Sequence, residues 1–285
     1  YAEPNDKGGR TAIARAELDG DTLRNLRVIF RQQPDAEGGN HWGSRLVVDR
    51  EGLLFATLGD RFTLRDKAQD LGTHLGKVVR IRTDGSVPAD NPFVAKPGAL
   101  PEIWSYGHRN PQGAALHPST GRLWTQEHGP QGGDEVNLTL GGRNYGWPVI
   151  TFGREYGTGW KIGEGTRRPD VEAPRWQWTP SIAPSGMAFY TGERFPAWRG
   201  SLLVGALRGQ MLVRLETDGD RIVREERMLE GLGERIRDVR QGPDGFVYLL
   251  TDHPEGRILK LTPAAAADVS PAPGPESTRR MEKSR

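Results

Sequence analysis

The chain has 285 residues, a formal net charge of +2 and no cysteine. A charge balance this close to neutral excludes a global field that would attract nucleic acid or a membrane surface. The lack of cysteine excludes disulfides, zinc-thiolate sites and thiol nucleophiles, and no apolar run approaches the ~20 residues of a membrane span. Glycine and proline, at 38 and 21 residues, favour many turns and short strands.

The chain opens with YAEPNDKGGRTAIARAEL, which predicts the end of one strand, a turn and a second strand. No signal peptide is visible. A start in the middle of a strand pattern is typical of a fragment or a processed product. We therefore expect part of the fold to precede Tyr1, and we expect this portion alone to be prone to aggregation because it would expose sheet edges.

Four later segments resemble one another. Each combines an apolar strand, a turn that contains glycine, and a second strand that ends in an acidic or polar residue; they are 45–60, 113–129, 186–209 and 237–252. Further strand pairs are predicted at 76–93 and 209–229. All-β repeats of this size predict a β-propeller, whose blades typically have four strands around a channel. An ordinary β-sandwich is the alternative.

Charged and polar residues lie at the hairpin ends that a propeller would present to one mouth of its channel. Those before the first strands are His41, Arg109, Asn110, Arg235 and Arg237. Those at the ends of the second strands are Asp60, Glu127, His128, Arg208 and Asp252. Four guanidinium groups in one mouth would repel one another unless a polyanion lay between them, so the pattern predicts an anionic ligand.

Long motifs then resemble a known family. They are GNHWGSRLVVD, AQDLGTHLGKVVRI, EIWSYGHRNPQGAALHP, EHGPQGGDEVNL, GRNYGWP, SGMAFY, GALRG and RIRDVRQGPDG, spread in order over residues 1–262. They are similar to the soluble pyrroloquinoline-quinone (PQQ)-dependent aldose sugar dehydrogenases of the glucose/sorbosone dehydrogenase family. The resemblance implies an all-β, six-bladed propeller with PQQ and calcium at one mouth.

The same resemblance implies that this chain holds about five of the six blades. We expect the incomplete propeller domain to cover 1–263. The segment 264–285 is rich in alanine, proline, serine and charge without periodicity, and it is predicted to be a disordered tail.

The resemblance also implies roles for individual residues. His41 matches the general base that takes the proton of the anomeric hydroxyl while hydride passes to PQQ, a task that histidine performs most often. Arg109 and Asn110 match the pair that holds the quinone, and Arg109 would stabilise its developing negative charge. Tyr156 is expected to lie against the cofactor. The residues matched to cofactor carboxylates are Arg208, Arg235 and Arg237, with Arg208 replacing the usual lysine.

The glycine-rich stretch EHGPQGGDEVNL at 127–138 is matched to metal binding. The resemblance implies that the carbonyls of Gly129 and Pro130 face a calcium ion next to the cofactor, since calcium accepts carbonyl and carboxylate oxygens. Side chains there would block that approach. Glu135 and the carbonyl of Tyr145 match a second, structural calcium site.

The predicted activity is oxidation of the anomeric carbon of aldose sugars to lactones. A calcium-dependent propeller lactonase or other hydrolase, and a non-catalytic binding propeller, remain the alternatives. Neither G-x-S-x-G nor H-E-x-x-H occurs, which disfavours serine hydrolases and zinc proteases. The family further implies an unidentified electron acceptor, a periplasmic or secreted location, and a monomer or homodimer.

Overall fold

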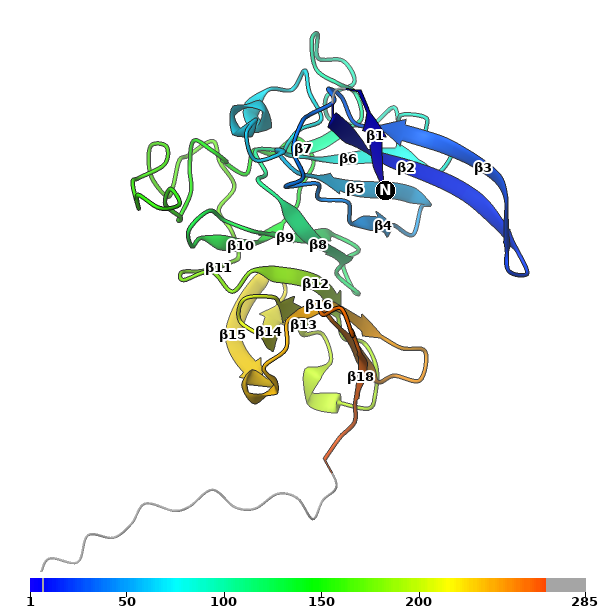
Figure 1. Ribbon diagram of the computed structural model, residues 1–285, viewed down its shortest axis with the longest axis vertical. Helices are drawn as coiled ribbons and strands as arrows, with labels where there is room; N and C mark the ends of the chain where they lie inside the picture. The colour runs from blue at the N-terminus through cyan, green and yellow to red at the C-terminus, as the bar shows by residue number, and fades with distance from the viewer. Residues whose placement is uncertain (7, 265–285) are drawn as a thin grey trace, which may run out of the picture.

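The protein is described here by a computed structural model that covers residues 1–6 and 8–264. Apart from residue 264, the predicted disordered tail at 264–285 lies outside the described residues. The described residues form five antiparallel sheets, each built from strands that are consecutive in the chain (Figure 1).

The sheets are given in chain order. The first contains β1 (Ala2–Asn5), β2 (Gly8–Asp19) and β3 (Thr22–Arg31). The second contains β4 (Leu46–Val48), β5 (Leu53–Leu58), β6 (Lys77–Arg82) and β7 (Ile103–Tyr106). The third contains β8 (Pro111–Leu116), β9 (Leu123–Glu127), β10 (Asp134–Leu138) and β11 (Trp176–Trp178). The fourth contains β12 (Pro184–Phe189), β13 (Leu202–Ala206), β14 (Met211–Asp218) and β15 (Arg221–Met228). The fifth contains β16 (Ile236–Gln241), β17 (Val247–Thr251) and β18 (Ile258–Leu261).

Helical structure within the described residues is confined to three short 3₁₀ segments, η1 (Arg65–Gln69), η2 (Pro196–Trp198) and η3 (Glu230–Leu232). No helix in this part of the chain has the length and apolar character that crossing a bilayer requires.

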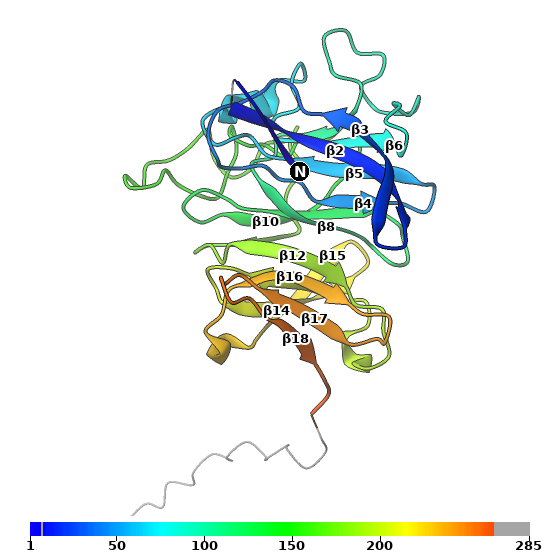
Figure 2. The ribbon, with the colours of Figure 1, turned by 45° about the vertical axis from the view of Figure 1, so that its right-hand side comes forward.

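The five sheets are blades of a β-propeller, which confirms the predicted all-β fold with about five blades in this chain. The first strands of four blades, β4, β8, β12 and β16, line the channel: β8 lies next to β4 and β12, and β12 next to β16 (Figure 2). The later strands of each blade follow outward. Because every blade repeats this order, the residues that precede the first strands share one end of the channel.

Apolar side chains fill the spaces between successive blades. Separate buried clusters join the first blade to the second, the second to the third, the third to the fourth and the fourth to the fifth. The cluster between the third and fourth blades is the largest and includes Trp124, Trp178 and Met187. Second strands are covered on both faces, so β5 and β13 are buried along their whole length.

The four predicted hairpin repeats are confirmed as the first two strands of the second to fifth blades. Their turn glycines, Gly52, Gly121, Gly200 and Gly245, all have positive φ angles between 69° and 84°. Glycine adopts this region without the steric cost that a Cβ atom brings. The local turn chemistry therefore agrees with the observed hairpins.

One predicted strand pair is wrong. Residues 76–93 contain only β6, and its next partner is β7 at Ile103–Tyr106. The Asn91 amide group donates to the backbone carbonyls of Arg80 and Pro101, and this fixes the intervening segment as a loop. The prolines at 88 and 92 have no backbone N–H to donate to a strand ladder.

Candidate active site

The same hydrogen-bond pattern occurs at the hairpins of three blades. An acidic residue at the end of the second strand accepts a hydrogen bond from a residue just before the first strand. The pairs are His41 Nδ1 with Asp60 (2.6 Å), the Arg109 amide with Glu127 (2.5 Å) and Arg235 Nε with Asp252 (2.8 Å). The repeat thus places three fixed polar groups at one mouth of the channel.

His41 is held in one orientation by Asp60. The Asp60 side chain is fully buried, and its carboxylate also accepts hydrogen bonds from the Phe62 amide (2.8 Å) and from the Trp147 indole (2.7 Å). A carboxylate that already receives two donors acts as an acceptor, so His41 donates to it from Nδ1. The Nε2 atom of His41 then presents a lone pair, which is the arrangement of a general base.

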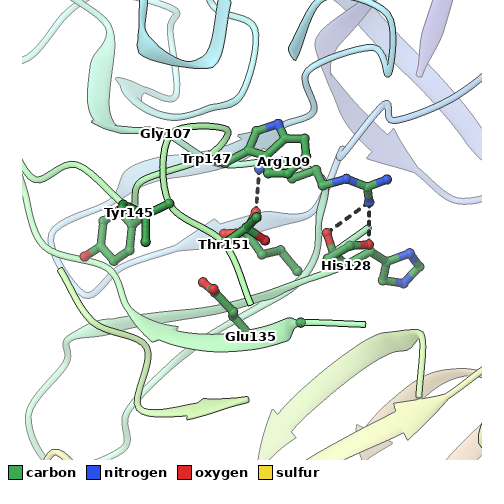
Figure 3. A pocket seen from close by; sticks show the side chains of 11 residues that line it. Gly107, Arg109, His128, Glu135, Tyr145, Trp147 and Thr151 are labelled. Atoms are coloured by element: carbon green, nitrogen blue, oxygen red, sulfur yellow. Dashed lines mark hydrogen bonds between the residues drawn. The ribbon is translucent and has the colours of Figure 1, made fainter. Parts of the chain in front are cut away.

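Arg109 lies next to this pair. Its guanidinium donates from Nη1 to the carbonyls of His128 (3.1 Å) and Gly129 (2.7 Å) (Figure 3). The buried Nε has no hydrogen-bond partner among the described residues. The guanidinium carbon lies 5.3 Å from the ring centre of Trp147 and 5.9 Å from that of Tyr156. An unpartnered buried donor beside two aromatic rings suits a flat ligand that carries a hydrogen-bond acceptor.

A cavity of about 440 Å³ opens at this point. Its walls include Phe62, Arg109, Trp147 and Tyr156, so it joins the aromatic rings to the arginine. The Phe62 ring also meets the His41 imidazole edge to face, with 5.2 Å between the ring centres. The His41 imidazole, the Arg109 guanidinium and the aromatic walls therefore belong to one site.

The loop between β9 and β10 is crowded with carbonyl oxygens. A Cβ atom on Gly129 would overlap the carbonyl oxygens of Gly132 and Gly133. The buried Asp134 carboxylate holds the loop by accepting from the Gly129 amide (2.9 Å) and from the amides of Ile182 and Ala183 (both 2.9 Å). Only bare backbone fits here, as the glycine-rich sequence predicts.

Glu135 faces a small cavity beside this loop. The cavity, of about 10 Å³, is lined by Arg109, Glu135, Tyr145 and Trp147 among others, and it has room for one water-sized occupant (Figure 3). Burial, followed by the nearby charges of Glu127 and Asp134, raises the pKa of Glu135 to about 8. Both causes disfavour the ionised form of this carboxyl group.

Calcium accepts backbone carbonyls together with a single carboxylate. The residues that could hold such an ion are Gly129 and Pro130 at one position and Glu135 and Tyr145 at a second. The described residues bring no three His, Cys, Asp or Glu side chains into a metal-binding group. Gly129 and Glu135 both border the small cavity, and so does Tyr145.

The other predicted cofactor residues are distributed more widely. Arg208 lines a separate cavity of about 370 Å³ with Trp178 and Glu230. Arg237 bonds the same Asp252 as Arg235 does, at 3.3 Å. Asn110 accepts hydrogen bonds from the Gly43 amide and from Gln112. Arg109 and Arg208 therefore border different cavities.

Three residues of the site were not predicted in these roles. The sequence predicts Asp60 at the channel mouth but not as the partner of His41, and it indicates no role for Phe62 or Trp147. Asp60 could have been found by aligning the hairpins, because it occupies the position of Glu127 and Asp252. Trp147 is brought to Asp60 from 87 residues away, and no local pattern indicates this contact.

Fold and site together define a β-propeller with a histidine–aspartate pair beside an aromatic cavity at one mouth of its channel. The chain belongs to the Glucose / Sorbosone dehydrogenase family, because the sequence model of that family matches residues 1–260. This confirms the resemblance that the motifs indicated.

Individual relatives agree. Aldose sugar dehydrogenase YliI of Escherichia coli is 46% identical over 268 residues, which are 92% of this chain and 72% of that protein. A crystal structure described as glucose dehydrogenase is 50% identical, with a TM-score of 0.90 over 93% of this chain and 77% of the other. The PQQ-bound aldose sugar dehydrogenase of Streptomyces coelicolor is 28% identical, with a TM-score of 0.70 over 92% of this chain and 74% of that one. The chain spans about two thirds of the length of the curated relatives that it matches.

Proposed function

We propose that this protein is an oxidoreductase that oxidises the anomeric carbon of aldose sugars to lactones, with PQQ as the hydride acceptor. The observation that carries the proposal is the His41–Asp60 pair, hydrogen-bonded at 2.6 Å beside the cavity that Arg109 lines. Relatives named aldose sugar dehydrogenase and glucose dehydrogenase, and one relative described as PQQ-bound, support the substrate class and the cofactor.

In the proposed reaction, residues of the chain remove the hydroxyl proton of the sugar. His41 Nε2 accepts the proton of the anomeric hydroxyl, and Asp60 stabilises the imidazolium that forms. When bound, PQQ would supply the carbon that accepts the hydride from C1 of the sugar. Loss of the hydroxyl proton and the C1 hydride leaves a carbonyl, so a cyclic aldose becomes a lactone. Arg109 supplies positive charge where the electrons arrive.

The residues present fit PQQ at this site. The free Nε of Arg109 is a buried donor for a quinone oxygen, and the rings of Trp147 and Tyr156 offer flat walls. Asn110 would help to orient the quinone. The carboxylates of the cofactor would bind the remaining predicted arginines, Arg208, Arg235 and Arg237.

Calcium is proposed at the loop between β9 and β10. Gly129 and Pro130 would direct carbonyl oxygens to an ion next to the cofactor, where the ion would neutralise cofactor charge. Glu135, with the carbonyl of Tyr145, would hold a structural ion. The position of Glu135 and Tyr145 on the same small cavity supports this second site.

The family relationship also supports a periplasmic or secreted location and transfer of electrons from the reduced cofactor to an external acceptor. A fractionation of the native host tests the location directly: the proposal requires the protein in the periplasmic or secreted fraction.

The function is tested by loading the purified protein with PQQ and calcium and following the reduction of an electron-accepting dye with glucose and other aldoses. We expect a PQQ-dependent absorption change and dye reduction. Lactone hydrolysis without PQQ would support the lactonase instead. A protein that bound PQQ, as its spectrum would show, and yet oxidised none of the aldoses would contradict the proposal.

A further inference from the structure

Arg61 is a buried cation without an anionic partner in the part of the chain that the structure describes. Its side chain is 1% exposed, and its Nη2 donates to the carbonyl of Gly38. The Nε and Nη1 atoms have no hydrogen-bond partner within the described residues. Burial lowers the pKa of this guanidinium. A charged group in such a place costs stability unless other contacts offset the loss of water.

The Arg61 guanidinium makes both its hydrogen bond and its ring contact with the loop that carries His41. The guanidinium carbon lies 3.2 Å from the centre of the Trp42 ring, which is a close cation–π arrangement. The Trp42 indole in turn donates to the carbonyl of Gly39 at 2.9 Å. Arg61 therefore touches the residue next to His41 as well as Gly38, at the start of the loop.

The backbone of the loop 38–44 is strained and requires contacts that stabilise its conformation. His41 and Ser44 have φ angles of 53° and 79°, a region that residues with a side chain rarely adopt because it strains the backbone. Arg61 itself has a φ of 59°. Strain of this kind persists only where the surroundings impose it, and it is concentrated on both sides of the contact between Arg61 and the loop.

We propose that Arg61 is a positioning residue for the general base: by clamping the Trp42 indole and the Gly38 carbonyl, it holds residues 38–44 in the conformation that presents His41 to the channel mouth. The inference rests on the proposed function of His41. Asp60 and Arg61 are consecutive, and so are His41 and Trp42. Two consecutive residues after β5 therefore contact two consecutive residues of the loop. The Asp60 carboxylate bonds the His41 imidazole, and the Arg61 guanidinium stacks on the Trp42 indole.

The test compares Arg61→Met with a matched control, Arg80→Met. Arg80 is also a buried arginine stacked on a tryptophan, 4.4 Å from the ring centre of Trp104, but it bonds Asn91 and Asp90 and lies on β6. Methionine keeps the length and the apolar stem of arginine without its charge. Three quantities are measured: hydrogen exchange of residues 38–44, PQQ affinity, and kcat for glucose of the loaded protein.

In Arg61→Met we expect exchange of residues 38–44 to become at least fivefold faster, kcat to fall at least tenfold, and the Kd for PQQ to change less than twofold. Its melting temperature should fall no further than that of Arg80→Met, whose loop exchange and kcat should match the wild type. Arg61→Lys, which keeps the charge and a donor, should recover part of the lost kcat.

Unchanged loop exchange and unchanged kcat in Arg61→Met would overturn the inference. So would faster exchange spread evenly over the chain, since that indicates global destabilisation. A separate outcome concerns the proposed function: if the wild type oxidises no aldose but only the 38–44 loop loosens in Arg61→Met, the positioning of the loop stands and the proposed reaction falls.

Discussion

At the scale of single residues, two side chains of the site each use one nitrogen for a hydrogen bond within the protein and keep a second nitrogen without a partner among the described residues. His41 gives Nδ1 to Asp60, so Nε2 remains available. Arg109 gives Nη1 to two carbonyls, so Nε remains available. In both cases, the protein fixes the group with one atom and offers another to a ligand. This is preorganisation: the cost of orienting the group is met during folding rather than during the reaction.

Replacing His41 with alanine removes the proposed base. We expect kcat to fall by roughly 100-fold or more, the usual scale for a lost general base. PQQ affinity should be nearly unchanged, because Arg109 and the aromatic walls remain. The control is His253→Ala, an exposed histidine that accepts a hydrogen bond from the Glu255 amide and should keep full turnover. Near-wild-type sugar oxidation by the PQQ-loaded His41 variant would refute the assignment.

Lys77 has a structural role within the second blade. It is fully buried at the start of β6, and its ammonium donates to the carbonyls of Lys67 (2.9 Å), Ala68 (3.0 Å) and Leu75 (2.7 Å). These bonds tie η1 to the second blade. Burial lowers the pKa of Lys77 from 10.5 to about 7, so the folded protein holds this proton less tightly than the unfolded chain.

The lowered pKa of Lys77 predicts a pH-dependent stability. Between pH 7 and pH 10 the unfolded chain binds more protons than the folded protein, so the free energy of unfolding should rise with pH, by about 3–4 kcal/mol from this group. Lys77→Met should lose this rise and should be less stable throughout, because three carbonyls lose their donor. Urea unfolding of both proteins at several pH values measures the difference. Parallel pH profiles would exclude the contribution.

At the scale of elements, the loop between β9 and β10 has glycine at the point where its backbone carbonyl groups come close together. Gly129→Ala would push a Cβ atom into the carbonyl oxygens of Gly132 and Gly133. We expect a loss of about 3 kcal/mol in stability, the upper end of the usual range for overpacking, because the overlapped atoms belong to the backbone. We also expect weaker calcium binding, because the carbonyls must move apart.

The control for Gly129→Ala is Gly121→Ala. Gly121 has a φ of 69° but open space around its Cβ position, so alanine there brings strain without overlap. We expect this variant to lose only about 1 kcal/mol and to bind calcium normally. Calcium titration followed by thermal unfolding compares the two. Equal effects would mean that the crowding at Gly129 has no particular role.

At the scale of the whole molecule, one ion pair connects distant blades across the channel. Arg45, just before β4, bonds Asp238 on β16 at 3.1 Å, and its Nε donates to the Gln112 carbonyl on β8 at 3.2 Å. The second, third and fifth blades thus meet at one guanidinium. Both side chains of the pair are largely screened from solvent, with 21% and 17% exposure, so the pair should contribute more than a surface ion pair does.

Arg45→Met is therefore expected to lower the free energy of unfolding by about 1–2 kcal/mol, because Asp238 loses one of its charged partners and the Gln112 carbonyl loses its donor. Arg221→Met breaks the exposed pair with Asp218 on the fourth blade and should change stability by less than about 0.5 kcal/mol. Chemical unfolding of the two variants under the same conditions provides the measurement. A smaller effect for Arg45 than for Arg221 would rule out a role in joining the blades.

The sequence by itself determined the local architecture and the family. Hairpins could be predicted because turn glycines such as Gly52 and Gly245, and the apolar strands beside them, act within a few residues of each other. The long motifs then indicated the family, which the match over residues 1–260 confirms. The failed strand prediction at 76–93 shows the limit, since its loop depends on Asn91 bonding the carbonyl of Pro101 outside that window.

Only the tertiary structure decided which of the predicted residues share a site. Arg208 lies after the second strand of its hairpin and borders a different cavity from Arg109, which meets Trp147 and Tyr156. Asp60 acquires its role by receiving Trp147 from a loop of the next blade. Such contacts depend on the angle between neighbouring blades and on how their side chains pack. Those quantities arise from the sum of many weak interactions between distant segments, and no stretch of sequence contains them.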